Sequence, residues 1–411
     1  MTSLTTRSDS PAGAPPAAPT APPRRRAGLA LSGTALTVLL MAASAPSPFY
    51  PRMQERFGLS PVGITLVFAV YAVALLATLL TVGSLSDHIG RRPVITTGFL
   101  VLAGGMVLLW TAQSSAGLFA GRAVQGLASG FLLSALSASI SDFAPPVRPM
   151  RAALLNAAAP MVGLSLGALS AGVALAVSTH AEAIVFGTLA TAYCLVAGAV
   201  WLVPETSARV AGWRRSLVPR MSVPQGVRRL FLISIPIIVA GWATGGLFFS
   251  LGPDIAAEQL GIRGPLAQSA VIAVLPIAGM LAVFAMHARP PRTAMVFAAC
   301  TLGAGTLVSL IALQTGWLPL YVAAVAVTGT GFGTGFMGVI GSIAPVVPPE
   351  RRGALFAALY TTAYLSFGVP TVIAGALVSA LSLSTATVIY GIIVIAAAAI
   401  AGVSRAFVVR D

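Results

Sequence analysis

The stretch Gly83-Ser84-Leu85-Ser86-Asp87-His88-Ile89-Gly90-Arg91-Arg92-Pro93 separates two long apolar segments of the chain. It places an acid, a pair of arginines and a pair of glycines in a loop that is too short to form a domain. Asp87 follows the end of one predicted helix, Gly90 permits a tight reversal of the backbone, and Arg91-Arg92 begin the next helix. Connecting loops usually tolerate many sequences, so this defined layout indicates a function.

The composition indicates that the chain lies in a lipid bilayer. Charged residues make up 8% and hydrophobic residues 57%, with a mean hydropathy of +0.93, whereas an ordinary soluble domain has about 25% charged residues. All 24 basic residues are arginines. The absence of lysine excludes a Walker-type phosphate loop and Schiff-base catalysis. The arginines stand in short groups between apolar spans, which is typical of membrane topology rather than of a nucleic-acid-binding surface.

Twelve apolar segments are predicted to cross the bilayer as helices. A helix needs about 20 residues to do so, and an open strand would leave backbone groups unpaired in lipid. The first segment, Gly28–Phe49, also has features of a cleaved signal peptide, but its length suits a retained helix. The others are expected at 62–83, 93–112, 117–141, 152–177, 182–203, 229–251, 267–287, 293–314, 317–342, 354–379 and 383–403.

The arginines predict the orientation of these spans. Most of them fall in segments that are cytoplasmic if the N-terminus is inside, as the positive-inside rule requires. Both termini are therefore expected in the cytoplasm. We predict a disordered cytoplasmic tail at 1–27, a six-helix bundle at 28–204, a cytoplasmic linker at 205–228, a second six-helix bundle at 229–404 and a cytoplasmic C-terminus at 405–411.

An internal repeat relates the two halves. At one constant offset Gly126 matches Gly329 and Gly172 matches Gly375, which aligns the fourth and fifth spans with the tenth and eleventh. The counterpart of the Asp87 loop, residues 287–292, keeps the positive charge but has no acid. The repeat is therefore expected to be asymmetric at that loop.

The pattern G-x-L-x-D-x-x-G-R-R at 83–92 resembles the loop between the second and third helices of the major facilitator superfamily. The resemblance covers residues 28 to about 404. It implies an all-α integral membrane protein, with twelve transmembrane helices in two pseudo-symmetric six-helix bundles and a transport path between them. The implied protein is a multi-pass transporter of the cell inner (plasma) membrane, neither an enzyme nor a cofactor-binding protein. A merely topogenic loop would need neither Asp87 nor the glycines.

Gating is the role that the resemblance implies for the loop and its partner. Asp142, at the inner end of the fourth span, is expected to pair with Arg91, although a solvated helix-end charge is the alternative. Asp87 is expected near Gly353, at the start of the eleventh helix, when the inner side is closed. The candidate gating residues are Gly83, Asp87, Gly90, Arg91, Arg92 and Asp142.

Arg122 is the charge that we predict inside a span. With Gly126 it resembles the family's R-x-x-x-G pattern. A buried guanidinium costs about 2.5–3.5 kcal/mol at mid-helix on insertion scales, so Arg122 is a coupling or cavity candidate. The alternative is an arginine that snorkels to the interface. Further cavity candidates have uncharged polar or aromatic side chains, and any of them could instead be a packing residue: Tyr71, Gln125, Asn156, Trp242, Gln268, Tyr360 and Tyr364.

Small residues in the fourth and fifth spans predict close helix packing. The fifth-span run resembles the family's antiporter-associated motif, but the expected Gly-Pro pair is Gly167-Ala168 here, which weakens an inference of antiport. The candidate packing residues are Gly126, Gly163, Gly167 and Gly172.

No acid lies in the middle of a predicted span, so nothing would compensate a compact cation there. We therefore expect the substrate to be a small, neutral and moderately apolar molecule, a drug or metabolite, or a weak anion. Within the family the chain resembles bacterial efflux permeases, and this resemblance implies that the substrate is exported. The expected partners are this substrate, the lipid bilayer and, as a candidate coupling ion, protons; we expect a monomer, without nucleic acid, cofactor or metal. Alternatives are an importer of a sugar or small metabolite and a lipid-flipping protein. The three histidines are far apart in sequence, which argues against a membrane enzyme.

Overall fold

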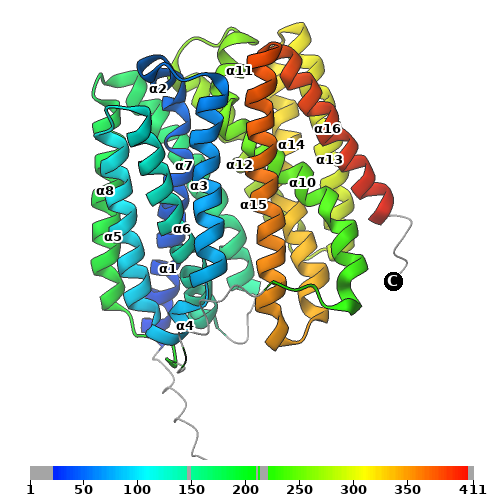
Figure 1. Ribbon diagram of the computed structural model, residues 1–411. Coiled ribbons are helices and arrows are strands. Elements are labelled where there is room, and N and C mark those ends of the chain that lie inside the picture. Colours follow the sequence, from blue (N-terminus) through cyan, green and yellow to red (C-terminus); the bar gives the residue numbers. More distant parts are fainter. Residues whose placement is uncertain (1–21, 146–149, 210–211, 213–220, 406–411) are drawn as a thin grey trace, which may run out of the picture.

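The computed structural model describes residues 22–145, 150–209, 212 and 221–405. Within these residues every regular element is a helix, and twelve helical segments are long and apolar enough to cross a membrane. Figure 1 shows the long helices running side by side between the two ends of the molecule. The predicted all-α class and span number are confirmed.

The N-terminal half holds six of these segments, with short helices at their ends. The helices are α1 (Pro22–Ser44), η1 (Ser47–Phe49), α2 (Tyr50–Phe57), α3 (Pro61–Val82), α4 (Leu85–Ile89), α5 (Arg91–Trp110), α6 (Ser115–Phe143), α7 (Met150–Val177), α8 (Ala181–Ala199) and η2 (Val200–Leu202).

The C-terminal half repeats this arrangement without a counterpart of α4 in its described residues, as the missing acid suggested. Its helices are η3 (Gln225–Val227), α10 (Arg228–Ser250), α11 (Gly252–Glu258), α12 (Pro265–Met286), α13 (Pro291–Thr315), α14 (Leu318–Ile343), η4 (Ala344–Val346), α15 (Pro349–Ala380) and α16 (Leu383–Val403).

The first helix differs from its predicted boundaries at both ends. Residues 22–27, which we assigned to a disordered tail, form the first turns of α1. The helix ends at Ser44 rather than Phe49, because Pro46 and Pro48 lack the N–H groups that would continue it. The chain then turns through η1 into α2. The predicted disorder of residues 1–21, and the predicted position of residues 406–411, lie outside the described residues.

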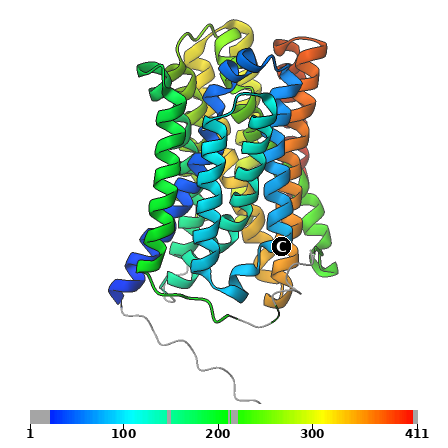
Figure 2. The ribbon, with the colours of Figure 1, turned by 60° about the vertical axis from the view of Figure 1, so that its left-hand side comes forward.

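The short helices define the two ends of the molecule. Helices α2 and α11 lie together at one end, which we call the α2 end, and α4 lies at the opposite end, which we call the α4 end (Figure 1). Figure 2 shows the segment after α8 crossing the α4 end of the N-terminal bundle.

Equivalent helices pack in the same way within each half. A Cβ added to Gly126 of α6 would meet the carbonyl of Tyr71 on α3, and one added to Gly329 of α14 would meet the carbonyl of Leu275 on α12. Both glycines thus let the fourth helix of a half approach the second one closely. This equivalence agrees with the repeat found in the sequence and with two pseudo-symmetric bundles.

The two bundles contact each other through two equivalent helix pairs, α7 with α12 and α3 with α15. Near the α2 end, Gly172 of α7 lies against Ser269, and the matching Gly375 of α15 lies against Thr65. Helix α2 also contacts α11 across the bundles there. The bundles are therefore joined at the α2 end.

Candidate functional site: a loop network and an aromatic bundle interface

Gly90 forms the turn between α4 and α5. Its φ of +110° and ψ of 151° belong to a region that side chains rarely adopt. A Cβ at this position would also lie 2.8 Å from Oε2 of Glu205. The turn therefore needs a glycine for its own conformation and for the approach of a carboxylate.

Glu205 caps the start of α5. Its Oε1 accepts hydrogen bonds from the backbone N–H groups of Arg91 at 2.9 Å and of Thr206 and Ser207 at 3.0 Å, and its Oε2 accepts one from Arg92 at 3.1 Å. Burial opposes ionisation, but these backbone donors outweigh it and lower the pKa of Glu205. A residue that we had placed only at the start of the linker thus fixes the Asp87 loop.

Arg91 connects the loop to α6. Its Nη1 pairs with the carboxylate of Asp87 and donates to Ser86 Oγ at 2.6 Å, while its Nε donates to Asp142 Oδ2 at 3.3 Å. Asp142 also accepts a hydrogen bond from Thr206 Oγ1 at 2.7 Å. The expected Arg91–Asp142 pair is therefore present. We call Asp87, Arg91, Asp142, Glu205 and Thr206 the loop network.

Among the described side chains, the ion-pair partner of Asp87 is Arg91 and not a residue of the eleventh helix. The Asp87 side chain is half exposed, and a Cβ added to Gly353 of α15 would meet no atom within 4 Å. Our prediction of an Asp87 contact near Gly353 concerns the state in which this end is closed, and it stays a prediction. The two remaining gating candidates flank the loop: Gly83 follows α3, and Arg92 donates to the carbonyl of Val203.

Arg122 of α6 is fully buried. Its Nη1 donates to Oε1 of Gln125, and the Gln125 amide donates in turn to the carbonyl of Ala42 on α1. The guanidinium carbon lies 4.5 Å from the ring centre of Tyr71 and 5.8 Å from that of Phe68, both on α3. The side chain therefore points into the protein and does not reach the surface as a snorkelling arginine would.

Aromatic side chains meet at the interface between the bundles. In the C-terminal bundle, the Trp242 ring centre lies 5.0 Å from that of Tyr364 and 5.9 Å from that of Phe367. Phe68 of α3 reaches Phe367 at 4.8 Å, and Tyr71 packs in one cluster with Tyr364. We call the following set the aromatic cluster: Phe68, Tyr71, Trp242, Phe336, Tyr360, Tyr364 and Phe367.

Two predicted cavity residues lie apart from this cluster. Gln268 is near the α2 end, where its amide donates to the carbonyl of Ile262 at 2.9 Å. Asn156 follows Leu155, whose side chain packs on Gly33 of α1. Gly33 lies more than two helical turns closer to the α4 end than Ala42, which is the residue that Gln125 contacts. The structure thus groups Tyr71, Arg122, Gln125, Trp242, Tyr360 and Tyr364 and leaves the other two outside.

The predicted packing glycines lie at close helix approaches. A Cβ at Gly163 or Gly167 of α7 would meet backbone atoms of α1, a Cβ at Gly126 would meet α3, and a Cβ at Gly172 would meet α12 of the other bundle. These positions are compatible with the packing role that the sequence suggested.

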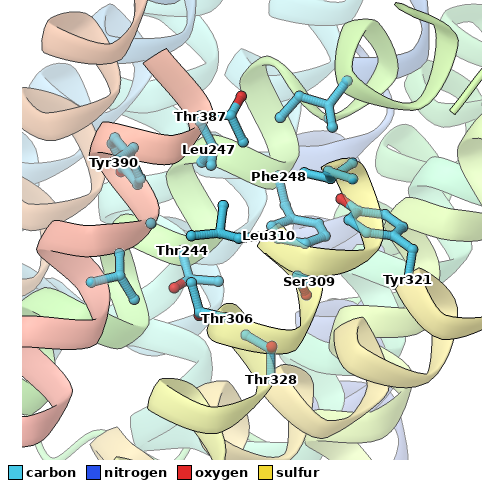
Figure 3. A pocket seen from close by; sticks show the side chains of 15 residues that line it. Thr244, Leu247, Phe248, Thr306, Ser309, Leu310, Tyr321, Thr328, Thr387 and Tyr390 are labelled. Atoms are coloured by element: carbon cyan, nitrogen blue, oxygen red, sulfur yellow. The ribbon is translucent and has the colours of Figure 1, made fainter. Parts of the chain in front are cut away.

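The cavity of Figure 3 lies inside the C-terminal bundle and not between the bundles. It offers about 40 Å³, lined by residues of α10, α11, α13, α14 and α16 that include Thr244, Ser309, Tyr321 and Tyr390. Ser309 Oγ is buried and has no hydrogen-bond partner. Sites for drug-sized ligands measure about 300–1,000 Å³, so this cavity suits a few water molecules rather than a transported molecule.

Asp254 is a titratable group at the α2 end that the sequence did not single out as a site. It lies on α11, which packs against α10, α12 and α2. Burial, and to a smaller degree the neighbouring charge of Glu258, raise the pKa of Asp254 to about 7. Its carboxyl group can therefore gain or lose a proton near neutral pH.

Comparison with known proteins agrees with this architecture. A sequence profile described as the Major Facilitator Superfamily matches residues 33–289, more than half of the chain. The chain belongs to this superfamily. As a member it is a membrane transporter of small molecules and not an enzyme.

Its relatives include multidrug resistance proteins. The chain is 23% identical over 281 residues to the multidrug resistance protein MdtL of Shewanella sp. (strain ANA-3), covering 65% of this chain and 68% of the relative. For MdtL of Klebsiella pneumoniae (strain 342) the identity is 25% over 307 residues, with coverage of 70% and 72%. A solved bacterial homologue of the human lysosomal transporter Spinster, in an inward-facing and unoccupied conformation, superimposes with a TM-score of 0.74 at 15% identity, covering 94% of this chain and 98% of that one.

Proposed function

We propose that this transporter exports small, moderately apolar molecules by alternating access, with the α4 end facing the cytoplasm. The observation that supports this most strongly is the aromatic cluster, in which Trp242, Tyr364 and Phe367 of one bundle meet Phe68 and Tyr71 of the other. A ligand bound there would contact both bundles, so their relative movement would change its access to either side.

The chemistry of the cluster favours apolar substrates. Aromatic faces bind by apolar contact and tolerate varied shapes, with a few polar groups to orient the ligand. Among the described residues, the acids lie outside the middle of the membrane-length helices. A compact or divalent cation would find no carboxylate to compensate its charge there. The similarity to proteins named for multidrug resistance supports the export of such compounds as a proposal for this chain.

We propose that the loop network acts as a gate at the α4 end. Arg91 holds Asp87 on α4 and Asp142 on α6 together, and Glu205 attaches the linker to the same turn. Ser222, at the other end of the linker, donates its backbone N–H to the carbonyl of Ala354 on α15 at 3.3 Å. We propose protons as the coupling ion.

The test uses the purified full chain in proteoliposomes with an imposed pH gradient. Neutral, anionic and dicationic compounds of similar size are compared, and we expect the dications to be moved least. Trp242→Ala should slow transport of the apolar compounds at least tenfold. The matched control is Trp317→Ala, because Trp317 is exposed at the start of α14, away from the cluster. Transport of none of the compounds, or preferential transport of dications, contradicts the proposal.

A further inference from the structure

The guanidinium of Arg122 is only partly satisfied by the protein. It is fully buried, and its Nη1 donates to Gln125, but its Nε and Nη2 have no hydrogen-bond partner. Among the described residues, no acid forms an ion pair with Arg122. A buried cation without a carboxylate is costly and persists where function requires it.

The orientation of this guanidinium is fixed. Gln125 is held by its donation to the carbonyl of Ala42, and so presents its oxygen to Arg122. Tyr71 and Phe68 place their rings against the guanidinium. The nearby Tyr50 hydroxyl is also buried without a partner. The planar fork of an arginine suits a carboxylate, which accepts two parallel N–H groups.

We propose that Arg122 binds an anionic group, a carboxylate, on the transported molecule, while the apolar part of that molecule packs on the aromatic cluster. This inference rests on the proposed export function and narrows its substrate class to amphipathic organic acids. Tyr71 connects the two parts of the site, because its ring lies against Arg122 and also packs with Tyr364 of the other bundle.

Binding is tested by thermal unfolding of the detergent-purified full chain with 1-naphthoate and with 1-naphthamide. The two probes share their ring, and one is an anion while the other is neutral. The wild-type melting temperature should rise more with the acid, because a ligand that binds only the folded state stabilises it. Arg122→Gln should weaken acid binding at least tenfold and leave amide binding within threefold. The matched control is Arg56→Gln, at an exposed arginine, which should change neither.

Two further variants separate a ligand site from a structural arginine. Arg122→Met removes an unsatisfied charge at similar length, so the ligand-free melting temperature should rise while the acid-dependent shift disappears. Gln125→Glu places a carboxylate within reach of Arg122, so it should raise the ligand-free melting temperature and compete with the acid. A structural role predicts lower melting temperatures for Arg122→Met.

Equal stabilisation of the wild-type protein by acid and amide, or by neither, overturns the proposal, as does an undiminished acid effect in Arg122→Gln. These binding outcomes do not depend on transport. If neutral compounds are exported and Arg122→Gln has no effect on either acid or amide, the export proposal stands and the anion site fails. If naphthoate binds through Arg122 and no compound is exported, the anion site stands and the export proposal fails.

Discussion

At the scale of single residues, Asp87 is expected to contribute little to the free energy of unfolding. Its pair with Arg91 is half exposed and spans one helical turn, and such pairs contribute about 0.2–1 kcal/mol. The spacing of Asp87 from the glycines and arginines of the loop, by contrast, is specific. The contribution of Asp87 is therefore expected in another conformation, in which it would meet the start of α15 when the α4 end closes.

Asp87→Asn should reduce transport at least tenfold and lower the melting temperature by only about 2–4 °C, the equivalent of roughly 1 kcal/mol. Transport in proteoliposomes and thermal unfolding are measured on the same preparation. The control is Glu182→Gln, which removes the acid of the exposed Arg56–Glu182 pair and should leave transport unchanged. Transport at the wild-type rate in Asp87→Asn would show that the loop serves only to set the membrane topology.

Asp254 offers a residue-scale prediction on pH. Burial and Glu258 raise its pKa from 3.8 to about 7, so between these values the folded protein holds more protons on this carboxyl than the unfolded chain. The free energy of unfolding should therefore decrease as pH rises through this window, and increase as pH falls. Asp254→Asn keeps the group neutral and should flatten that part of the profile.

The measurement is the melting temperature between pH 4.5 and pH 8, with one kcal/mol equal to about 2–4 °C in domains of 150–250 residues. Glu258→Gln is the companion variant: it removes the neighbouring charge and should shift the decrease to lower pH without abolishing it. An unchanged profile in Asp254→Asn would mean that other groups set the pH dependence.

At the scale of elements, the sequence predicted which segments are helices better than what joins them. Twelve spans follow from apolar length, since lipid leaves helices as the suitable structure. The break after Ser44, which Pro46 and Pro48 impose, was missed because the residues around it stay apolar. Glu205 was missed for a different reason: its role depends on α5, far away in the sequence, and no local pattern marks it.

Glu205→Gln tests this connection between elements. The variant keeps an acceptor oxygen but loses the charge that the α5 N-terminus favours, so unfolding should become easier by about 1–2 kcal/mol at pH 7. Because the folded-state pKa of Glu205 is lowered, the wild-type advantage should be present above the unfolded-state pKa and disappear as pH falls through the folded-state value. Equal melting temperatures for variant and wild type at pH 7 would show that the cap is dispensable.

At the scale of the whole molecule, the orientation in the membrane is the first open prediction. The positive-inside bias and the twelve spans predict that both termini and the linker lie in the cytoplasm. Reporter fusions after Asp411 and within residues 205–228 should read as cytoplasmic, and a fusion near Arg263 as external. An external signal after Asp411 would contradict the topology.

The sequence predicted the bundle architecture but only part of the site. The loop motif and the glycine repeat have fixed spacings, and these spacings predict the fold. Candidate ligand residues have no such spacing: Trp242 and Tyr364 come from different helices and meet only after packing. Asn156 and Gln268 had the same polar character and do not join the cluster. Depth along a helix separates these cases, and composition does not record it.

The last prediction concerns the movement of one bundle against the other. Gly368 of α15 faces Ala72 of α3 across the interface, and a Cβ at Gly368 would lie 3.7 Å from that of Ala72. Cβ atoms of disulfides are separated by about 3.5–4.5 Å. Gly368→Cys with Ala72→Cys should therefore form a disulfide on oxidation. The free and exposed Cys194 and Cys300 are first replaced by serine, and a protease site in the linker makes the cross-link visible as retained co-migration of the two halves.

If transport requires the bundles to rock, the oxidised protein should lose at least nine-tenths of its transport rate, and a reductant should restore it. Each single-cysteine variant, treated with the same oxidant, controls for the substitution and the chemistry. Full transport by completely cross-linked protein would exclude movement between α3 and α15 as a step of the cycle. Failure to cross-link at all would contradict the close approach of the two helices, and with it the interface on which the aromatic cluster depends.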